Sequence, residues 1–202
     1  RMLLIIFFSN FFQFFVYIIF IKDCSDSIIS VRIHRASMAQ SFYEFKVKDA
    51  NGKEVSLGEK YKGKVVIIVN VASKCGLTPV NYTQLKDILD EYKDRGLAVA
   101  AFPCNQFADQ EPDCAADIEE FVKKQYSMEP DLYEKIEVNG DRADPLWKWL
   151  RKQKSKGDTI KWNFTKFLVS RNGEIINRYG PTIEPKSFIA DIEKALAEPS
   201  KL

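Results

Sequence analysis

Hydrophobic residues follow two different patterns after residue 41. Residues 64–71 and 97–102 are short, nearly continuous apolar runs, which is typical of strands covered on both faces of a sheet. Between them, apolar residues recur at helical spacing up to Gly96, namely Leu85, Ile88, Leu89 and Tyr92. The pattern therefore predicts a strand, a helix and a second strand in succession.

The segments around this unit predict two hairpins and three further helices. The hairpins are expected at 42–47 with 54–55, turning at Asn51-Gly52, and at 165–169 with 174–179. The helices are expected at 118–126, 146–150 and 183–197. This order predicts an α/β protein with a thioredoxin-like fold, in which helices flank a central mixed sheet.

Residues 1–21 form a separate apolar stretch, long enough for a signal peptide or a membrane anchor. No small-x-small cleavage site follows it, the chain opens on Arg1, and Met38 directly precedes the globular pattern. We interpret residues 1–37 as a hydrophobic leader, anchor or non-native extension, with a start at Met38 favoured, and residues 38–202 as the folded domain. A cytoplasmic location follows from a start at Met38, whereas a native leader would make the protein secreted or membrane-anchored.

Charge and cysteine content narrow the function classes. Thirty Lys and Arg residues balance 28 Asp and Glu residues, so a nucleic-acid surface is not expected. The four cysteines form no C-x-x-C motif, and His34 is the single histidine. These counts argue against a metal site, a thioredoxin-type dithiol and a Cys-His nucleophile pair.

Cys75 lies between the first core strand and the following helix. Thr78 and Pro79 predict that this helix begins about one turn after the sulfur, with the Thr78 hydroxyl as N-cap. A helix N-terminus and the cation of Lys74 both favour a thiolate. A small buried side chain in the loop is an equally good interpretation of Cys75 on this pattern alone.

Three motifs, taken together, resemble the glutathione peroxidase family. They are NVASKCGLT at 70–78, FPCNQFADQEP at 102–112 and KWNFTKF at 161–167, and the resemblance runs over roughly 42–196. Within this family, the chain resembles the cysteine-containing, phospholipid-hydroperoxide-like subtype. The resemblance implies that Cys75 is the peroxidatic residue and that Gln110, Trp162 and Asn163 complete the catalytic set.

The implied enzyme is a thiol peroxidase. It would reduce hydrogen peroxide and organic or lipid hydroperoxides through a sulfenic acid on Cys75, with glutathione as reducing co-substrate and no bound cofactor. Gln110, Trp162 and Asn163 suit this chemistry because all three donate hydrogen bonds and none titrates near neutral pH. A non-catalytic thioredoxin-fold binding module is the alternative if Cys75 is unreactive.

The expected reductant depends on whether the chain carries a resolving cysteine. Relatives that use thioredoxin carry a resolving cysteine in the middle helix, where this chain has Lys123. Glutathione is therefore favoured, with Lys161 as a partner for its carboxylates. The alternative is a thioredoxin-dependent peroxidase or redox relay that uses Cys114 or Cys104 as the resolving thiol.

Segment lengths and sequons bear on substrate and compartment. Residues 150–161 are too few for the assembly loop of the family's tetramers, which implies a monomer with an open site that admits lipid peroxides. Ala108 and Asp109 stand where many relatives have glycines, which puts the geometry around Gln110 in question. Asn81 and Asn163 begin formal glycosylation sequons, and a glycan on Asn163 would fill the site, which favours the cytosol.

Overall fold

The computed structural model describes residues 4–5, 18–19, 41–154 and 157–200. Arg1–Gln40 and Ser41–Leu202 are two separate compact units. In the first, β1 (Leu4–Ile5) pairs antiparallel with β2 (Ile18–Ile19), and the leader predicted for 1–37 otherwise lies outside the described residues, as does His34. None of the described helices combines the length and apolar character needed to cross a membrane.

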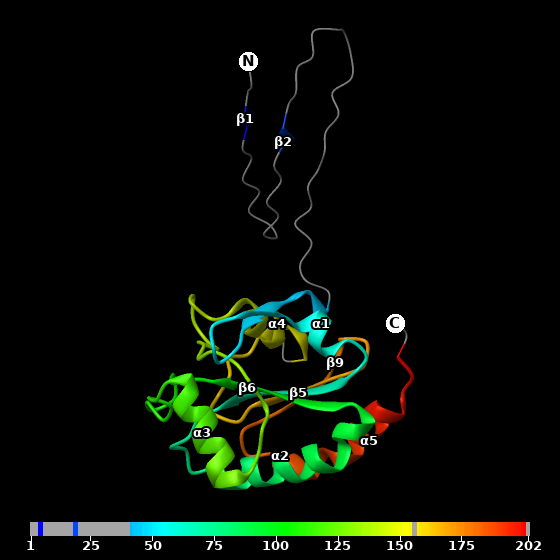
Figure 1. The fold of residues 1–202 in the computed structure, drawn as a ribbon. Coiled ribbons are helices and arrows are strands. Elements are labelled where there is room, and N and C mark those ends of the chain that lie inside the picture. Colours follow the sequence, from blue (N-terminus) through cyan, green and yellow to red (C-terminus); the bar gives the residue numbers. More distant parts are fainter. Residues whose placement is uncertain (1–3, 6–17, 20–40, 155–156, 201–202) are drawn as a thin grey trace, which may run out of the picture. The chain divides into compact units, whose positions relative to one another are not determined.

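The second unit is built on a mixed five-stranded sheet (Figure 1). Its order is β7 (Asp131–Leu132), β6 (Leu97–Pro103), β5 (Val65–Val71), β8 (Lys166–Val169) and β9 (Ile175–Tyr179). β5, β6 and β7 are parallel, whereas β8 runs antiparallel to β5 and to β9. The predicted α/β, thioredoxin-like fold with a central mixed sheet is confirmed.

Helices cover both faces of this sheet (Figure 1). The α-helices are α1 (Leu57–Tyr61), α2 (Thr78–Tyr92), α3 (Ala115–Tyr126), α4 (Pro145–Gln153) and α5 (Ile189–Ala197). Short 3₁₀ helices are η1 (Phe42–Glu44), η2 (Lys93–Arg95) and η3 (Pro185–Phe188). α2, α3 and α5 lie on one side of the sheet, and α1 and α4 lie on the other.

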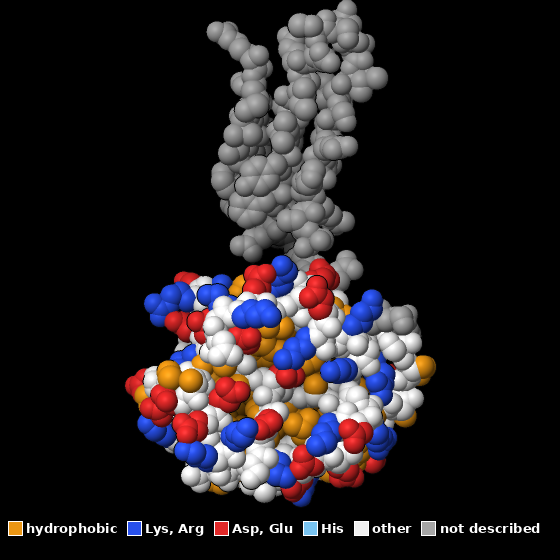
Figure 2. All heavy atoms as spheres, in the orientation of Figure 1, with side chains coloured by type: hydrophobic (Ala, Val, Ile, Leu, Met, Phe, Trp, Pro, Cys, Tyr) orange, Lys and Arg blue, Asp and Glu red, His pale blue; other side chains and the backbone are white. Residues whose placement is uncertain are grey.

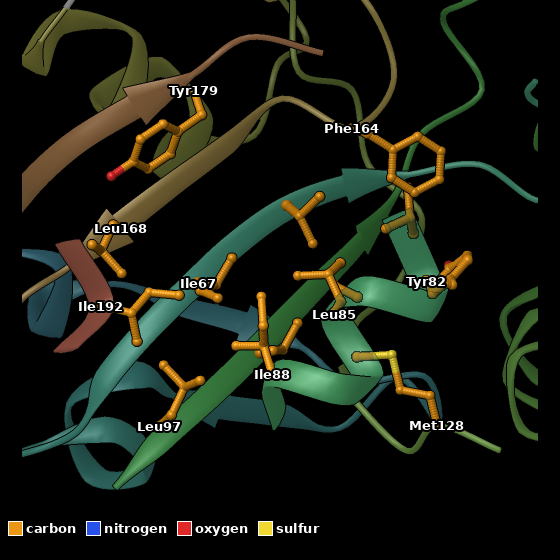
Figure 3. Close-up of a cluster of buried hydrophobic side chains, with 14 of the residues drawn as sticks. Ile67, Tyr82, Leu85, Ile88, Leu97, Met128, Phe164, Leu168, Tyr179 and Ile192 are labelled. Atoms are coloured by element: carbon orange, nitrogen blue, oxygen red, sulfur yellow. The ribbon is translucent and has the colours of Figure 1, made fainter. Parts of the chain in front are cut away.

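The two cores arise because side chains of β5 alternate between the faces of the sheet. Ile67 packs among α2 and α5 side chains such as Ile88 and Ile192, as Figure 3 shows. On the opposite face the Trp147 ring lies 5.9 Å from Phe102 and 6.0 Å from Phe167. Both faces are buried, which explains why β5 is apolar along nearly its whole length.

Several predicted boundaries require correction. The first hairpin consists of β3 (Lys46–Lys48) and β4 (Glu54–Ser56); residues 42–44 are helical instead, because Ser41 and Glu44 form a capping box. The closing helix begins at Ile189, since Pro185 opens a separate 3₁₀ turn. The patterns missed α1 and β7, which are too short to show a period.

Candidate active site

Cys75 occupies the turn between β5 and α2, where it is 6% exposed. Its sulfur accepts a hydrogen bond from the Leu77 amide at 3.5 Å, and its carbonyl accepts one from the Thr78 amide at 3.0 Å. The predicted N-cap is wrong: Leu77 is the cap residue, and the Thr78 hydroxyl donates to the Ala72 carbonyl at 2.6 Å. The sulfur thus faces a backbone amide at the start of the helix and accepts a hydrogen bond from it.

Gln110 is brought to this turn by the loop after β6. Its carbonyl accepts a hydrogen bond from the Lys74 amide at 3.0 Å, one residue before Cys75. The loop has a glycine-like path, since φ is +53° at Ala108 and +51° at Asp109. The loop therefore keeps a left-handed backbone at both positions without having a glycine at either.

Asn163 is fully buried and donates from Nδ2 to Oε1 of Gln110 at 2.9 Å. Because the Gln110 oxygen accepts this bond, its Nε2 group remains the donor end of the side chain. The neighbouring Trp162 is 37% exposed, and its ring lies 5.6 Å from that of Phe107 in the Gln110 loop. Three loops therefore meet at the carboxyl end of β5, where ligand sites of such sheets lie.

Asn70 holds the third loop in place, and the sequence patterns did not identify it. It is buried at the end of β5, where its Nδ2 donates to the Trp162 carbonyl at 3.2 Å and its Oδ1 accepts from the Thr165 amide at 2.9 Å. Its carbonyl also accepts the Phe164 amide at 2.7 Å. The backbone at Phe164 is in the left-handed region, with φ +61°. The Phe164 ring packs against Tyr82 (Figure 3). The sequence did hold one signal for Asn70, because it is a polar residue within an otherwise apolar strand.

The two other candidate thiols occupy contrasting environments. Cys104 is fully buried, and burial raises the pKa of its thiol. Cys114 is exposed at the N-cap of α3 and donates to Oδ2 of Asp117 at 3.0 Å. Both are free, as is Cys75. Lys123, further along α3, is exposed and pairs with Glu129 at 2.6 Å.

Lys161 is exposed and lines a pocket of about 360 Å³ together with Lys154 and Arg178. Arg178 is fixed there by bonds from its guanidinium to the Asp158 and Thr159 carbonyls. Within the described ranges, no group of three His, Cys, Asp or Glu side chains could hold a metal ion. Positive and negative side chains are interspersed on the face shown in Figure 2.

Comparison with known proteins gives one consistent result. A family model described as glutathione peroxidase matches residues 42–151. The chain is 60% identical over 160 residues to glutathione peroxidase 1 of Caenorhabditis elegans, covering 78% of this chain and 98% of that protein. It is 51% identical over 164 residues to the "probable phospholipid hydroperoxide glutathione peroxidase" of Nicotiana sylvestris, covering 80% and 96%. The solved structure titled "Crystal structure of Trgpx in apo form" superimposes with a TM-score of 0.66 at 40% identity, covering 80% of this chain and 98% of that one.

Proposed function

The chain belongs to the glutathione peroxidase family and is a peroxidase-type oxidoreductase, and on this premise we propose that Cys75 reduces hydroperoxides with electrons from glutathione. One observation carries the assignment of the residues. The turn that holds Cys75 is bonded to Gln110 through the Lys74 amide, and Gln110 is bonded in turn to Asn163. These two bonds support a single site made of the Cys75 turn and the side chains of Gln110 and Asn163.

In the first half of the proposed cycle, the Cys75 thiolate attacks one peroxide oxygen. The S–O bond forms as the O–O bond breaks, so that sulfur becomes a sulfenic acid and the other oxygen leaves as hydroxide or alkoxide and takes up a proton. Nε2 of Gln110 and the indole N–H of Trp162 are donors suited to stabilise the developing negative charge. Asn163 orients Gln110 by fixing its oxygen.

In the second half, glutathione condenses with the sulfenic acid, which releases water and leaves a mixed disulfide. A second glutathione then displaces Cys75 as thiolate and departs as glutathione disulfide. Two features support an external thiol: position 123 is an ion-paired lysine, and Cys104 is fully buried. Lys161, in a pocket with Lys154 and Arg178, is suited to bind the carboxylates of glutathione.

For the peroxide, we propose lipid hydroperoxides in addition to hydrogen peroxide, and a monomeric enzyme. The name of the Nicotiana relative, a probable phospholipid hydroperoxide glutathione peroxidase, supports lipid hydroperoxides as substrates. Trp162 is 37% exposed, which supports a site open enough for a bulky acyl chain. The short connection between α4 and Trp162 supports the monomer, which light scattering during gel filtration would test.

For the location, we propose the cytoplasm. Both sequon asparagines are buried, Asn81 at 1% exposure and Asn163 at 0%. A glycan on either residue would be incompatible with this fold, which supports a route that avoids glycosylation. Fractionation of cells that express the full chain, with mass measurement of its N-terminus, tests this proposal.

The decisive experiment measures steady-state peroxide reduction with glutathione or with thioredoxin as the donor. We expect glutathione to support turnover, Cys75→Ser to abolish it and Cys114→Ser to leave it unchanged. Turnover that persists in Cys75→Ser would overturn the peroxidatic assignment. A preference for thioredoxin that disappears in Cys114→Ser would overturn glutathione as the donor and make Cys114 the resolving thiol.

A further inference from the structure

Several buried polar atoms beside the site have no use in the cycle described so far. Ser73 Oγ, Tyr82 Oη, both carboxylate oxygens of Glu111 and Oδ1 of Asn163 are buried and lack a hydrogen-bond partner among the described residues. Ser73 shares the turn of Cys75, and Glu111 directly follows Gln110. Buried polar atoms are almost always paired, so a cluster of unpaired ones next to a reactive sulfur points to a function.

Glu111 is the residue whose burial is hardest to explain structurally. Its side chain is 0% exposed, and its backbone is fixed by a hydrogen bond from its amide to Oδ1 of Asn105 at 2.7 Å. The Ser73 hydroxyl and amide are near enough to favour its charged form but do not complete hydrogen bonds of ordinary geometry with it. An unpaired buried carboxylate is costly, which favours the neutral acid.

The surrounding charges act on this carboxyl group in opposite directions. Burial raises the pKa of Glu111 to about 7, with Ser73 and Lys135 lowering it and Asp113 raising it. The Glu111 charge in turn contributes to the raised pKa values of Tyr82 and Cys104, although burial is the larger cause in both. A carboxylic acid that holds its proton near neutral pH is suited to general acid catalysis.

We propose that Glu111 stores the proton that the leaving oxygen of the peroxide takes up, and that it delivers this proton through the hydroxyl of Ser73. The inference rests on the proposed peroxidase cycle. When Cys75 sulfur forms its bond to oxygen and the O–O bond breaks, the departing alkoxide takes a proton from Ser73, which is replenished from the Glu111 carboxyl. Glu111 is reprotonated later, when the second glutathione thiol gives up its proton on forming glutathione disulfide. Over the full cycle Glu111 neither gains nor loses a proton.

The test is the rate at which reduced protein consumes a limiting amount of hydrogen peroxide before glutathione is added, from about pH 5.5 to about pH 9. The wild-type rate constant is expected to contain a component that falls as pH rises through about 7. Glu111→Gln should lose this component and react about 10²-fold more slowly at low pH, and Ser73→Ala should reproduce both effects. Glu137→Gln is the matched control and should keep the wild-type profile, because Glu137 is a partly buried carboxyl that pairs with Arg142.

Two charge variants keep the inference testable if Glu111→Gln does not fold. Lys135→Met should move the falling component to higher pH, and Asp113→Asn should move it to lower pH, because these charges act on Glu111 in opposite directions. A wild-type profile in Glu111→Gln, or an unmoved component in both charge variants, would overturn the relay. Failure of the peroxidase function itself would show differently, as peroxide consumption that is absent from the wild type or persists in Cys75→Ser.

Discussion

Replacing Asn70 by alanine should disable the site without removing any residue that contacts the substrate. The substitution deletes the hydrogen bonds to the Trp162 carbonyl and from the Thr165 amide. Thr165 is 1% exposed, so its amide would be left buried and unpaired, which costs about 1–3 kcal/mol. The Trp162 carbonyl keeps its bond from the Thr165 hydroxyl at 3.2 Å. With the lost volume included, we expect about 2–4 kcal/mol of destabilisation.

The effect on catalysis should be separate from this loss of stability and should persist in the folded variant. Asn70 sets the position of Trp162 and Asn163 relative to β5, and a displacement of about 1 Å in a positioned group can cost about 10²-fold in rate. We expect kcat/KM for the peroxide to fall by about that factor under conditions where the variant remains folded. Urea unfolding gives the stability, and coupled steady-state assays give the kinetic constants.

Ser170→Ala provides the matched control for this prediction. Ser170 is also buried at an end of β8, and its hydroxyl accepts the amides of Asn172 and Glu174 at 3.3 and 3.2 Å. It likewise loses two side-chain bonds to the backbone, but at the opposite end of the strand from Thr165. Equal kcat/KM in the two variants, after correction for the folded fraction, would refute the positioning role of Asn70.

Three further predictions concern the loops and charges of the site. Ala108→Gly should stabilise the protein by about 0.5–1 kcal/mol in thermal unfolding, because glycine adopts the left-handed backbone there without strain. Asp109→Gly should be stabilised less, since it also loses the hydrogen bond that Asp109 accepts from Asn105. A loss of stability in both variants would contradict backbone strain at these positions. Lys161→Glu should raise KM for glutathione severalfold while KM for the peroxide stays unchanged, and Lys161→Arg should behave as wild type; equal changes in both KM values would argue against carboxylate binding there. Glu111→Gln should match the wild type in urea unfolding near pH 4.5 and exceed it by about 3 kcal/mol near pH 8. Burial raises the folded-state pKa of Glu111 from 4.5 to about 7, so the wild type loses stability as pH rises from the first value to the second. Parallel stability curves would contradict this.

The sequence was most informative where burial imposes a period on the side chains. β5 and β6 were predicted to within one residue. The helical segment made of α2 and η2 ends at Gly96, as predicted, because φ there is +94° and glycine tolerates that conformation. Thr78 and Pro185 show the limit of such rules. Thr78 has the right residue type for a cap, but its hydroxyl has a better acceptor in the Ala72 carbonyl, and tertiary structure decides between the two.

The residues with direct chemistry were accessible through short motifs, whereas those that position them were not. Asn70 interrupts an apolar strand, and its neighbours in the sequence do not reveal its role. The residues that its side chain bonds, Trp162 and Thr165, are 92 and 95 residues away along the chain. Glu111 is adjacent to a predicted catalytic residue, yet a glutamate in a loop is ordinarily exposed, and only the fold shows its side chain to be buried. A site of this kind therefore depends on two sets of residues. Those that react can be recognised by type and spacing, and those that hold or protonate them become visible only when distant segments are brought together.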